Sequence, residues 1–184
     1  METQIQGQTY AVDPAHSTVE FIVRHLMIAK VRGRFTAFTG QVQLPAIGDL
    51  PSSISATIEA GSIDTREEQR DAHLRSADFF DAEKFPQLTF QSTRIHGEPD
   101  DFAIDGDLTI HGVTKPVTLK GTFEGRATDP WGNQRVGYAA HAAISRKDFG
   151  LTWNAALETG GVAVSDEVRI ELNVEALLQQ KTDS

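Results

Sequence analysis

Hydrophobic and polar residues alternate with a period of two along most of this chain. In the first such run, one face carries Ser17, Val19, Phe21, Val23, His25 and Met27. Because successive side chains of a β-strand point to opposite faces, the run predicts a half-buried strand. The alternation returns in residues 54–60, 88–90, 102–110, 117–123, 136–144 and 168–174, and residues 33–44 form a further segment. About eight antiparallel strands are predicted, a number that suits a closed barrel.

One segment, residues 66–80, is predicted to be an α-helix. Thr65 and Glu68 have the spacing of a capping box at its start, and Asp71 and Arg75 are spaced to pair across one turn. Residues 174–181 have a weaker helical pattern. The fold class expected is therefore mainly all-β: an antiparallel barrel with one helix packed against it.

Length and composition indicate one domain. The chain has 184 residues, of which 39% are hydrophobic and 23% charged, and it contains no long linker or repeat. A single domain over residues 1–184, with its core over about residues 10–175, is expected.

Charge and composition exclude several partners. The net charge of -9, without a cluster of Lys and Arg, argues against nucleic-acid binding. No run approaches the roughly 18 apolar residues of a membrane-spanning helix. Residues 1–8 lack the basic start and apolar run of a secretory leader, so a cytoplasmic location is expected.

The interior of such a barrel can be filled by its own side chains, or it can enclose one slender ligand. Small residues are predicted to face inward at Ala56, Ala60, Gly121, Ala140 and Ala142. They would leave volume for an apolar molecule, and burying a lipid chain is worth about 0.8 kcal/mol per CH2 group. The pattern alone leaves both interiors open.

Reactive motifs are sparse. Adjacent His16 and Ser17 would point to opposite faces of a strand, and the chain has no Gly-x-Ser-x-Gly elbow, no glycine-rich phosphate loop and no cysteine. The six histidines lack the local spacing of a metal site. Neither a catalytic site nor a metal site is therefore predicted.

His25 is the exception, because it lies in register with Val19, Phe21 and Val23 and is predicted to reach the interior or its rim. It could be a satisfied interior histidine, a hydrogen-bond partner of a ligand head group, or the base of a lipid-modifying enzyme. Arg24, Arg32 and Arg34 could meet a pyrophosphate or lie on a solvated strand face.

Specific strings identify a resemblance that composition does not. The sequence resembles the YceI-like family over about residues 10–175, in the expected order. The matching strings include Val12-Asp13-Pro14-Ala15-His16-Ser17, Val23-Arg24-His25-Leu26, Arg70-Asp71-Ala72-His73-Leu74-Arg75-Ser76, Lys84-Phe85-Pro86, Asp107-Leu108-Thr109-Ile110-His111-Gly112 and Arg146-Lys147-Asp148-Phe149-Gly150.

This resemblance implies an extended lipocalin-like barrel whose cavity holds an isoprenoid or another long-chain lipid. It also implies a non-enzymatic binding, transport or storage role, no cofactor beyond that lipid, a homodimer and transient contact with membranes. Many relatives carry a secretory leader, whereas this sequence starts almost directly at the first predicted strand, which favours the expected cytoplasmic location. The alternatives are an enzyme that uses His25 and a filled barrel that serves as a dimerisation module. The expected ligand contacts are Val19, Phe21, Val23, His25, Phe35, Phe38, Ile58, Phe90, Leu108, Leu119, Tyr138, Ala142 and Ile170.

Overall fold

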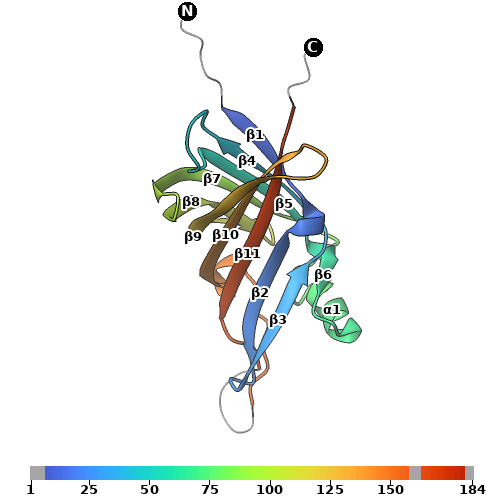
Figure 1. Cartoon of the computed structure of the whole chain (residues 1–184). Helices are drawn as coiled ribbons and strands as arrows, with labels where there is room; N and C mark the ends of the chain where they lie inside the picture. Colours follow the sequence, from blue (N-terminus) through green and yellow to red (C-terminus); the bar gives the residue numbers. More distant parts are fainter. Residues whose placement is uncertain (1–6, 158–162, 181–184) are drawn as a thin grey trace, which may run out of the picture.

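The computed structural model describes residues 7–157 and 163–180, and within them the chain is built almost entirely from antiparallel strands (Figure 1). The strands are β1 (Gln8–Val12), β2 (Thr18–His25), β3 (Ala29–Phe35), β4 (Phe38–Leu44), β5 (Ser53–Glu59), β6 (Ile63–Asp64), β7 (Gln87–Glu98), β8 (Asp101–Ile110), β9 (Val113–Thr128), β10 (Gln134–Ser145) and β11 (Glu167–Leu178). One α-helix, α1 (Glu68–Arg75), and three 3-10 turns, η1 (Pro14–His16), η2 (Ala60–Ser62) and η3 (Arg146–Phe149), complete the described elements.

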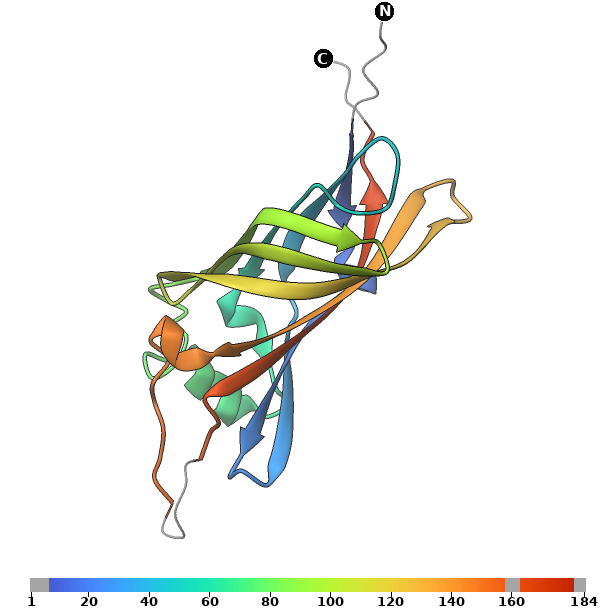
Figure 2. The same ribbon diagram turned by 90° about the vertical axis from the view of Figure 1, so that its left-hand side faces the viewer.

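Eight strands form a closed ring, which confirms the predicted barrel. Their order is β1-β4-β5-β7-β8-β9-β10-β11, and β11 returns to β1 through pairs such as Tyr10 with Leu178 and Val12 with Ala176. Closure leaves no free edge in this part of the sheet. In Figures 1 and 2 the ring strands wrap around the upper and middle parts of the molecule, with the start of β1 and the end of β11 at the upper end.

The remaining strands extend one wall downward. β11 pairs with β1 near its C-terminal end and with β2 nearer its start, where Leu172 lies opposite Val19. The short turn η1 separates β1 from β2. β2 pairs with β3, and β3 pairs with the short strand β6. The β2–β3 hairpin therefore projects below the ring (Figure 1).

The upper end of the barrel is packed shut. Tyr10, Leu44, Val136 and Ala176 are almost completely buried there. The Tyr138 hydroxyl donates to the carbonyl oxygen of Asp49 at 2.7 Å. These contacts hold the β4–β5 loop across the end of the barrel, so an interior space can open only lower down.

Two strand predictions needed correction. The segment over residues 33–44 is not one strand, because a turn separates Phe35 at the end of β3 from Phe38 at the start of β4. The first predicted strand ends at His25, so Met27 is not on its inward face. Leu26 and Met27 instead have positive φ angles of 52° and 60° and form the β2–β3 turn.

The helix is shorter than predicted and begins differently. It covers only Glu68–Arg75, and Glu67 rather than Thr65 caps it, accepting from the backbone N–H groups of Gln69 and Arg70. The Thr65 hydroxyl is not free to cap because it donates to buried Asp71.

The predicted Asp71–Arg75 pair is also wrong, since Arg75 donates to the carbonyl oxygens of Gly61 and Ile63. The weak helical pattern at residues 174–181 is a strand up to Leu178, and residue 181 lies outside the described part of the chain. In the described residues, no helix has the length and apolar character needed to span a membrane.

Candidate functional site

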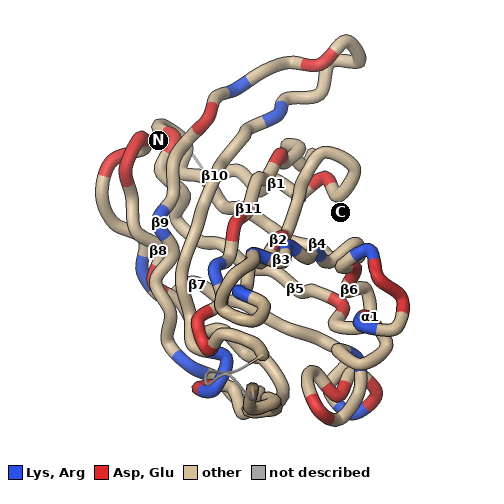
Figure 3. The backbone as a smooth tube through the Cα atoms, turned by 90° about the horizontal axis from the view of Figure 1, so that it is seen from below, with Lys and Arg blue, Asp and Glu red and all other residues tan. Residues whose placement is uncertain are grey.

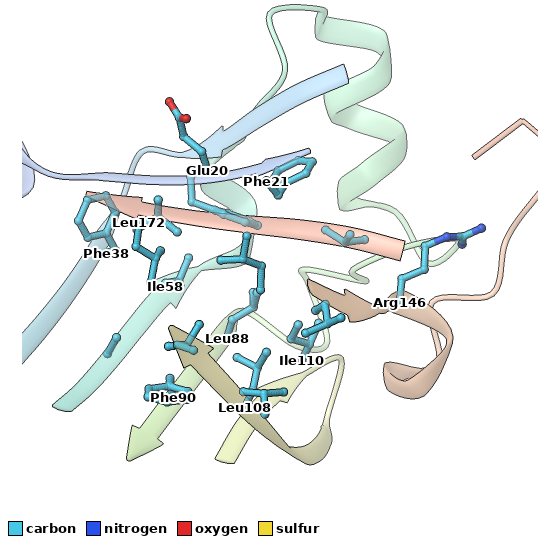
Figure 4. Close-up of a pocket in the computed structure, with 18 of the residues that line it drawn as sticks. Glu20, Phe21, Phe38, Ile58, Leu88, Phe90, Leu108, Ile110, Arg146 and Leu172 are labelled. Carbon is cyan, nitrogen blue, oxygen red and sulfur yellow. The ribbon is translucent and has the colours of Figure 1, made fainter. Parts of the chain in front are cut away.

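The lower half of the barrel encloses a cavity of about 450 Å³, within the usual range for small-molecule sites. Nearly all of its walls are aliphatic or aromatic (Figure 4). Large side chains from opposite strands converge on it, including Ile58, Leu88, Phe90, Leu108, Ile110 and Leu172. The structure therefore disagrees with a barrel filled by its own side chains.

The cavity runs along the strands from a packed end to a mouth. Phe102 and Tyr138 line its upper part, whereas Val23, His25 and Val164 line its lower part. The lining includes six of the seven β2 positions from Val19 to His25, all but Ile22, so it extends for roughly 20 Å along the strand. An elongated apolar molecule fits this shape better than a compact one.

Glycines keep three aromatic rings against the wall and out of the lumen. A Cβ atom at Gly33 would lie 2.2 Å from Phe21 Cζ, and one at Gly106 would lie 2.3 Å from Phe90 Cζ. At Gly121 the corresponding distance to Phe102 Cε2 is 2.4 Å. The space at Gly121, expected to hold ligand, is therefore occupied by the Phe102 ring. The open volume lies in the centre of the barrel, because these rings lie against the glycines at the wall.

The structure brings together all but one of the residues expected from sequence to contact ligand. Ala142 is the exception: it faces inward opposite Ile170, but it is buried in the core and does not line the cavity. Its single methyl group is too short to reach past larger neighbours. The expected residues that do line the cavity are Val19, Phe21, Val23, His25, Phe35, Phe38, Ile58, Phe90, Leu108, Leu119, Tyr138 and Ile170.

Part of the wall comes from segments that sequence periodicity did not point to. Leu74 of α1 and the following Phe79 and Phe80 line one side. His73 stacks edge-on against Phe79, with ring centroids 5.1 Å apart, and against Trp153, at 4.8 Å. These contacts join the helix to the segment after β10. No period-two pattern marks such residues, because they lie outside the strands.

Arg146 fixes that same segment from inside. Its side chain is almost fully buried and donates to the carbonyl oxygens of Leu151 at 2.7 Å, Trp153 at 2.8 Å and Ser165 at 3.0 Å. Burial lowers the pKa of Arg146, and Asp166 partly opposes this. In Figure 4 the guanidinium points away from the apolar side chains. The group is therefore a structural anchor for the segment after β10.

A few other polar groups border the mouth. Arg24, His25 and Arg70 are exposed and line it, while the lining residue Glu20 turns away from the cavity (Figure 4) and pairs with Arg32 at 2.7 Å. Higher up, burial raises the pKa of the Tyr138 phenol, and the nearby Asp49 carboxylate adds to the effect. Tyr138 therefore stays neutral and acts as a hydrogen-bond donor.

The described residues do not assemble a catalytic group around His25. Its ring makes no hydrogen bond to any described residue. The Ser17 hydroxyl is engaged by the backbone of Glu175, donating to its carbonyl oxygen and accepting from its N–H. His16 instead contacts Asp13, at 2.8 Å. The neighbouring His16 and Ser17 are therefore not a nucleophile-and-base pair.

Asp13, His16 and Glu175 lie close enough together to suggest a metal site outside the cavity. Arg135 already occupies the space between the carboxylates, with Nη1 2.8 Å from both Asp13 and Glu175. Hydrogen bonds from Arg135 and His16 lower the pKa of Asp13 to about 2. The cluster is an ion-pair network that joins the end of β1 to β10 and β11.

Comparison with known proteins agrees with this geometry. A model of the YceI-like domain matches residues 10–176. Protein YceI of Salmonella newport is 38% identical over 165 residues, covering 90% of this chain and 83% of that protein.

Two solved structures share the fold. BcnA of Burkholderia cenocepacia has a TM-score of 0.76 at 26% identity, covering 89% of this chain and 98% of the other. A domain from Saccharophagus degradans that is described as polyisoprenoid-binding has a TM-score of 0.66 at 17% identity, covering 94% and 99%. The barrel and its cavity agree with these matches, which show that the chain belongs to the YceI-like family.

Proposed function

We propose that this protein binds one long-chain lipid in the barrel cavity and carries or stores it without changing it chemically. The observation that supports this is the long apolar lumen. It has Phe102 in its packed part, and the exposed residues Arg24 and His25 line it at the end where β2 and β3 project. An isoprenoid chain is the ligand class that the family resemblance implies. The domain from Saccharophagus degradans described as polyisoprenoid-binding shares this fold.

Apolar burial is sufficient to hold such a ligand. Each CH2 group removed from water contributes about 0.8 kcal/mol before ordering costs are subtracted. The wall supplies few polar groups, so the cavity selects by length and thickness rather than by a hydrogen-bond pattern. The proposed ligand therefore has a long unbranched or methyl-branched chain and a head group at the mouth.

The enzyme alternative has less support. General acid–base catalysis needs a side chain that is positioned by hydrogen bonds next to the reacting atoms. The His25 ring has no such partner in the described residues. A non-enzymatic role therefore remains our proposal. The homodimer and the cytoplasmic location remain predictions, to be tested by light scattering and by fractionation of cells.

A plug in the lumen tests the carrier function. Ala140 lines the cavity, whereas Ala143 on the same strand is exposed. Ala140→Trp is expected to lower the uptake of a fluorescent polyprenol by at least about tenfold, because the indole occupies the volume needed by the chain. The matched control, Ala143→Trp, is expected to bind as the unmodified protein does.

Circular dichroism establishes that both variants are folded. Undiminished uptake by a folded Ala140→Trp protein would refute the cavity as the ligand site.

A further inference from the structure

The turn between β2 and β3 exposes three large aliphatic side chains in succession. Leu26, Met27 and Ile28 are exposed to 37%, 51% and 83%. Single exposed hydrophobic residues are ordinary on protein surfaces, whereas contiguous ones commonly mark a contact site. These three residues, called the hairpin tip below, form the lowest part of the hairpin in Figure 1.

The backbone of the hairpin tip is unusual for such residues. The Ile28 N–H donates to the His25 carbonyl oxygen at 3.2 Å, and Leu26 and Met27 between them have left-handed φ angles. A β-turn whose two central residues both have positive φ favours Asn-Gly there, because side chains with a Cβ are strained at positive φ. Leu26 and Met27 are therefore unfavourable in this turn for two reasons: their backbone conformation is strained, and their apolar side chains are exposed to water. Residues with such costs are often found where a protein makes a contact.

Positive charge flanks the hairpin tip. Arg24 and Lys30 are directly opposite each other across the two strands, and both are exposed. Neither has an ion-pair partner among the described residues. Like charges in such a pair repel each other, and the chain as a whole carries a net charge of -9. Figure 3 views this end of the molecule with Lys and Arg in blue.

The hairpin tip is continuous with the mouth of the cavity. Val23, His25 and Val31, from the same two strands, line the cavity immediately above it. A water-insoluble chain leaving the cavity would pass these residues. Aliphatic side chains flanked by cations match an anionic bilayer, in which acyl chains lie beneath negative head groups.

We propose that the hairpin tip docks the cavity mouth onto an anionic lipid bilayer, so that the ligand passes between membrane and lumen without crossing water. This rests on the proposed carrier function. A second copy of the chain fits the surface less well. Two identical tips would bring basic groups against basic groups, and three side chains are far fewer than the roughly 20–30 residues a side of a stable protein interface.

Vesicle sedimentation tests the docking with a variant designed to keep the fold. Leu26→Asn with Met27→Gly removes two aliphatic side chains and supplies the residues that the turn prefers. We expect the wild-type protein to bind vesicles of equal parts phosphatidylcholine and phosphatidylglycerol, and this double variant to bind them at least about tenfold more weakly. Ile47→Ser is the matched control, because Ile47 is 82% exposed in the loop at the opposite end; its binding should not change.

A second variant separates charge from apolar insertion. Arg24→Gln with Lys30→Gln should abolish the preference for these vesicles over vesicles of phosphatidylcholine alone. Docking through the hairpin tip is overturned if the wild-type protein does not sediment with the anionic vesicles, or if Leu26→Asn with Met27→Gly sediments equally well. It is also overturned if this variant changes the oligomeric mass measured by light scattering, which would make the tip a protein contact.

The lipid content of the same preparations keeps the two proposals apart. The tip variant should retain as much co-purified lipid as the wild-type protein. A lipid-loaded protein that ignores vesicles overturns the docking and leaves the carrier function standing. A protein that binds vesicles but neither contains nor takes up lipid overturns the carrier function, and with it the docking proposal.

Discussion

The ring of Phe21 lies directly over Gly33, its partner across strands β2 and β3, and leaves no room for a Cβ atom there. Both positions face the lumen, so the glycine decides where the ring goes. With hydrogen at this position, the ring lies flat against the wall and the centre of the barrel stays open. The open volume of the cavity thus depends on the absence of a side chain at Gly33 as well as on the residues that line the wall.

Gly33→Ala should therefore narrow the lumen. The added methyl group would come within 2.2 Å of Phe21 Cζ, and the ring can yield only by moving inward or by straining the sheet. We expect polyprenol uptake to fall and the free energy of unfolding to decrease by about 1–3 kcal/mol.

Gly61→Ala is the control, because a Cβ atom there has no neighbour within 4 Å. If Gly33→Ala bound lipid and resisted urea as the wild-type protein does, the ring would not be held by the glycine.

Replacing Arg146 should loosen the segment that borders the mouth. Arg146→Met leaves the carbonyl oxygens of Leu151, Trp153 and Ser165 without their donor, and we expect a loss of about 2–4 kcal/mol in the free energy of unfolding. Lys147→Met, at an exposed neighbouring position, should stay within about 0.5 kcal/mol of the wild type. Equal stabilities of the two variants in urea titrations would contradict the anchoring role.

The Arg135 network predicts a specific dependence of stability on pH. The pKa of Asp13 is lowered to about 2, chiefly by Arg135. At Asp129, burial opposes ionisation, but hydrogen bonds from Asn133 and Arg135 outweigh it and lower the pKa to about 2 as well. Because both values lie below the ordinary value of 3.8, this stabilisation is complete above about pH 4 and disappears as the pH falls towards 2.

Arg135→Met should accordingly be less stable than the wild type at neutral pH, with a difference that shrinks between pH 4 and pH 2. Urea titrations across this range measure the difference. Lys115→Met removes an exposed lysine that pairs with no carboxylate among the described residues and should show no such convergence. A difference for Arg135→Met that is constant with pH would mean that the ion pairs do not set these pKa values.

His25→Gln separates binding from catalysis. Because no described residue orients the His25 ring, the variant should take up polyprenol within about twofold of the wild type, and neither protein should convert the lipid. Chromatography of lipid extracted after incubation provides the measurement. Conversion by the wild type that His25→Gln abolishes would establish the enzyme alternative instead.

Much of the barrel could be predicted because hydrophobic and polar residues alternate along a strand that has one buried face. Val19, Phe21 and Val23 were assigned correctly to the cavity wall, since the period of two fixes which face each residue occupies. The same signal marked seven of the ring strands, but it missed β1, which closes the ring, and the strand it placed first, β2, lies outside the ring. Periodicity says nothing about where a strand turns, which is why Met27 was placed on β2 although the chain reverses at Leu26 and Met27.

The rest of the site depends on tertiary contacts that no local pattern encodes. Ala142 faces the interior as expected, yet whether an inward methyl group reaches the lumen depends on its neighbours across the barrel. Thr65 has the spacing of a helix cap, but its hydroxyl donates a hydrogen bond to buried Asp71 instead of capping the helix. Trp153 and Arg146 belong to the wall through contacts with α1 and with backbone carbonyl groups, which sequence spacing does not reveal.

The most direct test of the carrier function is native mass spectrometry of the freshly purified protein, followed by extraction and identification of any bound lipid. A tightly held apolar ligand should survive purification, so we predict a stoichiometric complex with one long-chain lipid, of the isoprenoid class. Incubation of ligand-free protein with a polyprenol should produce the same complex. A protein whose mass matches the bare chain both before and after that incubation would contradict the account.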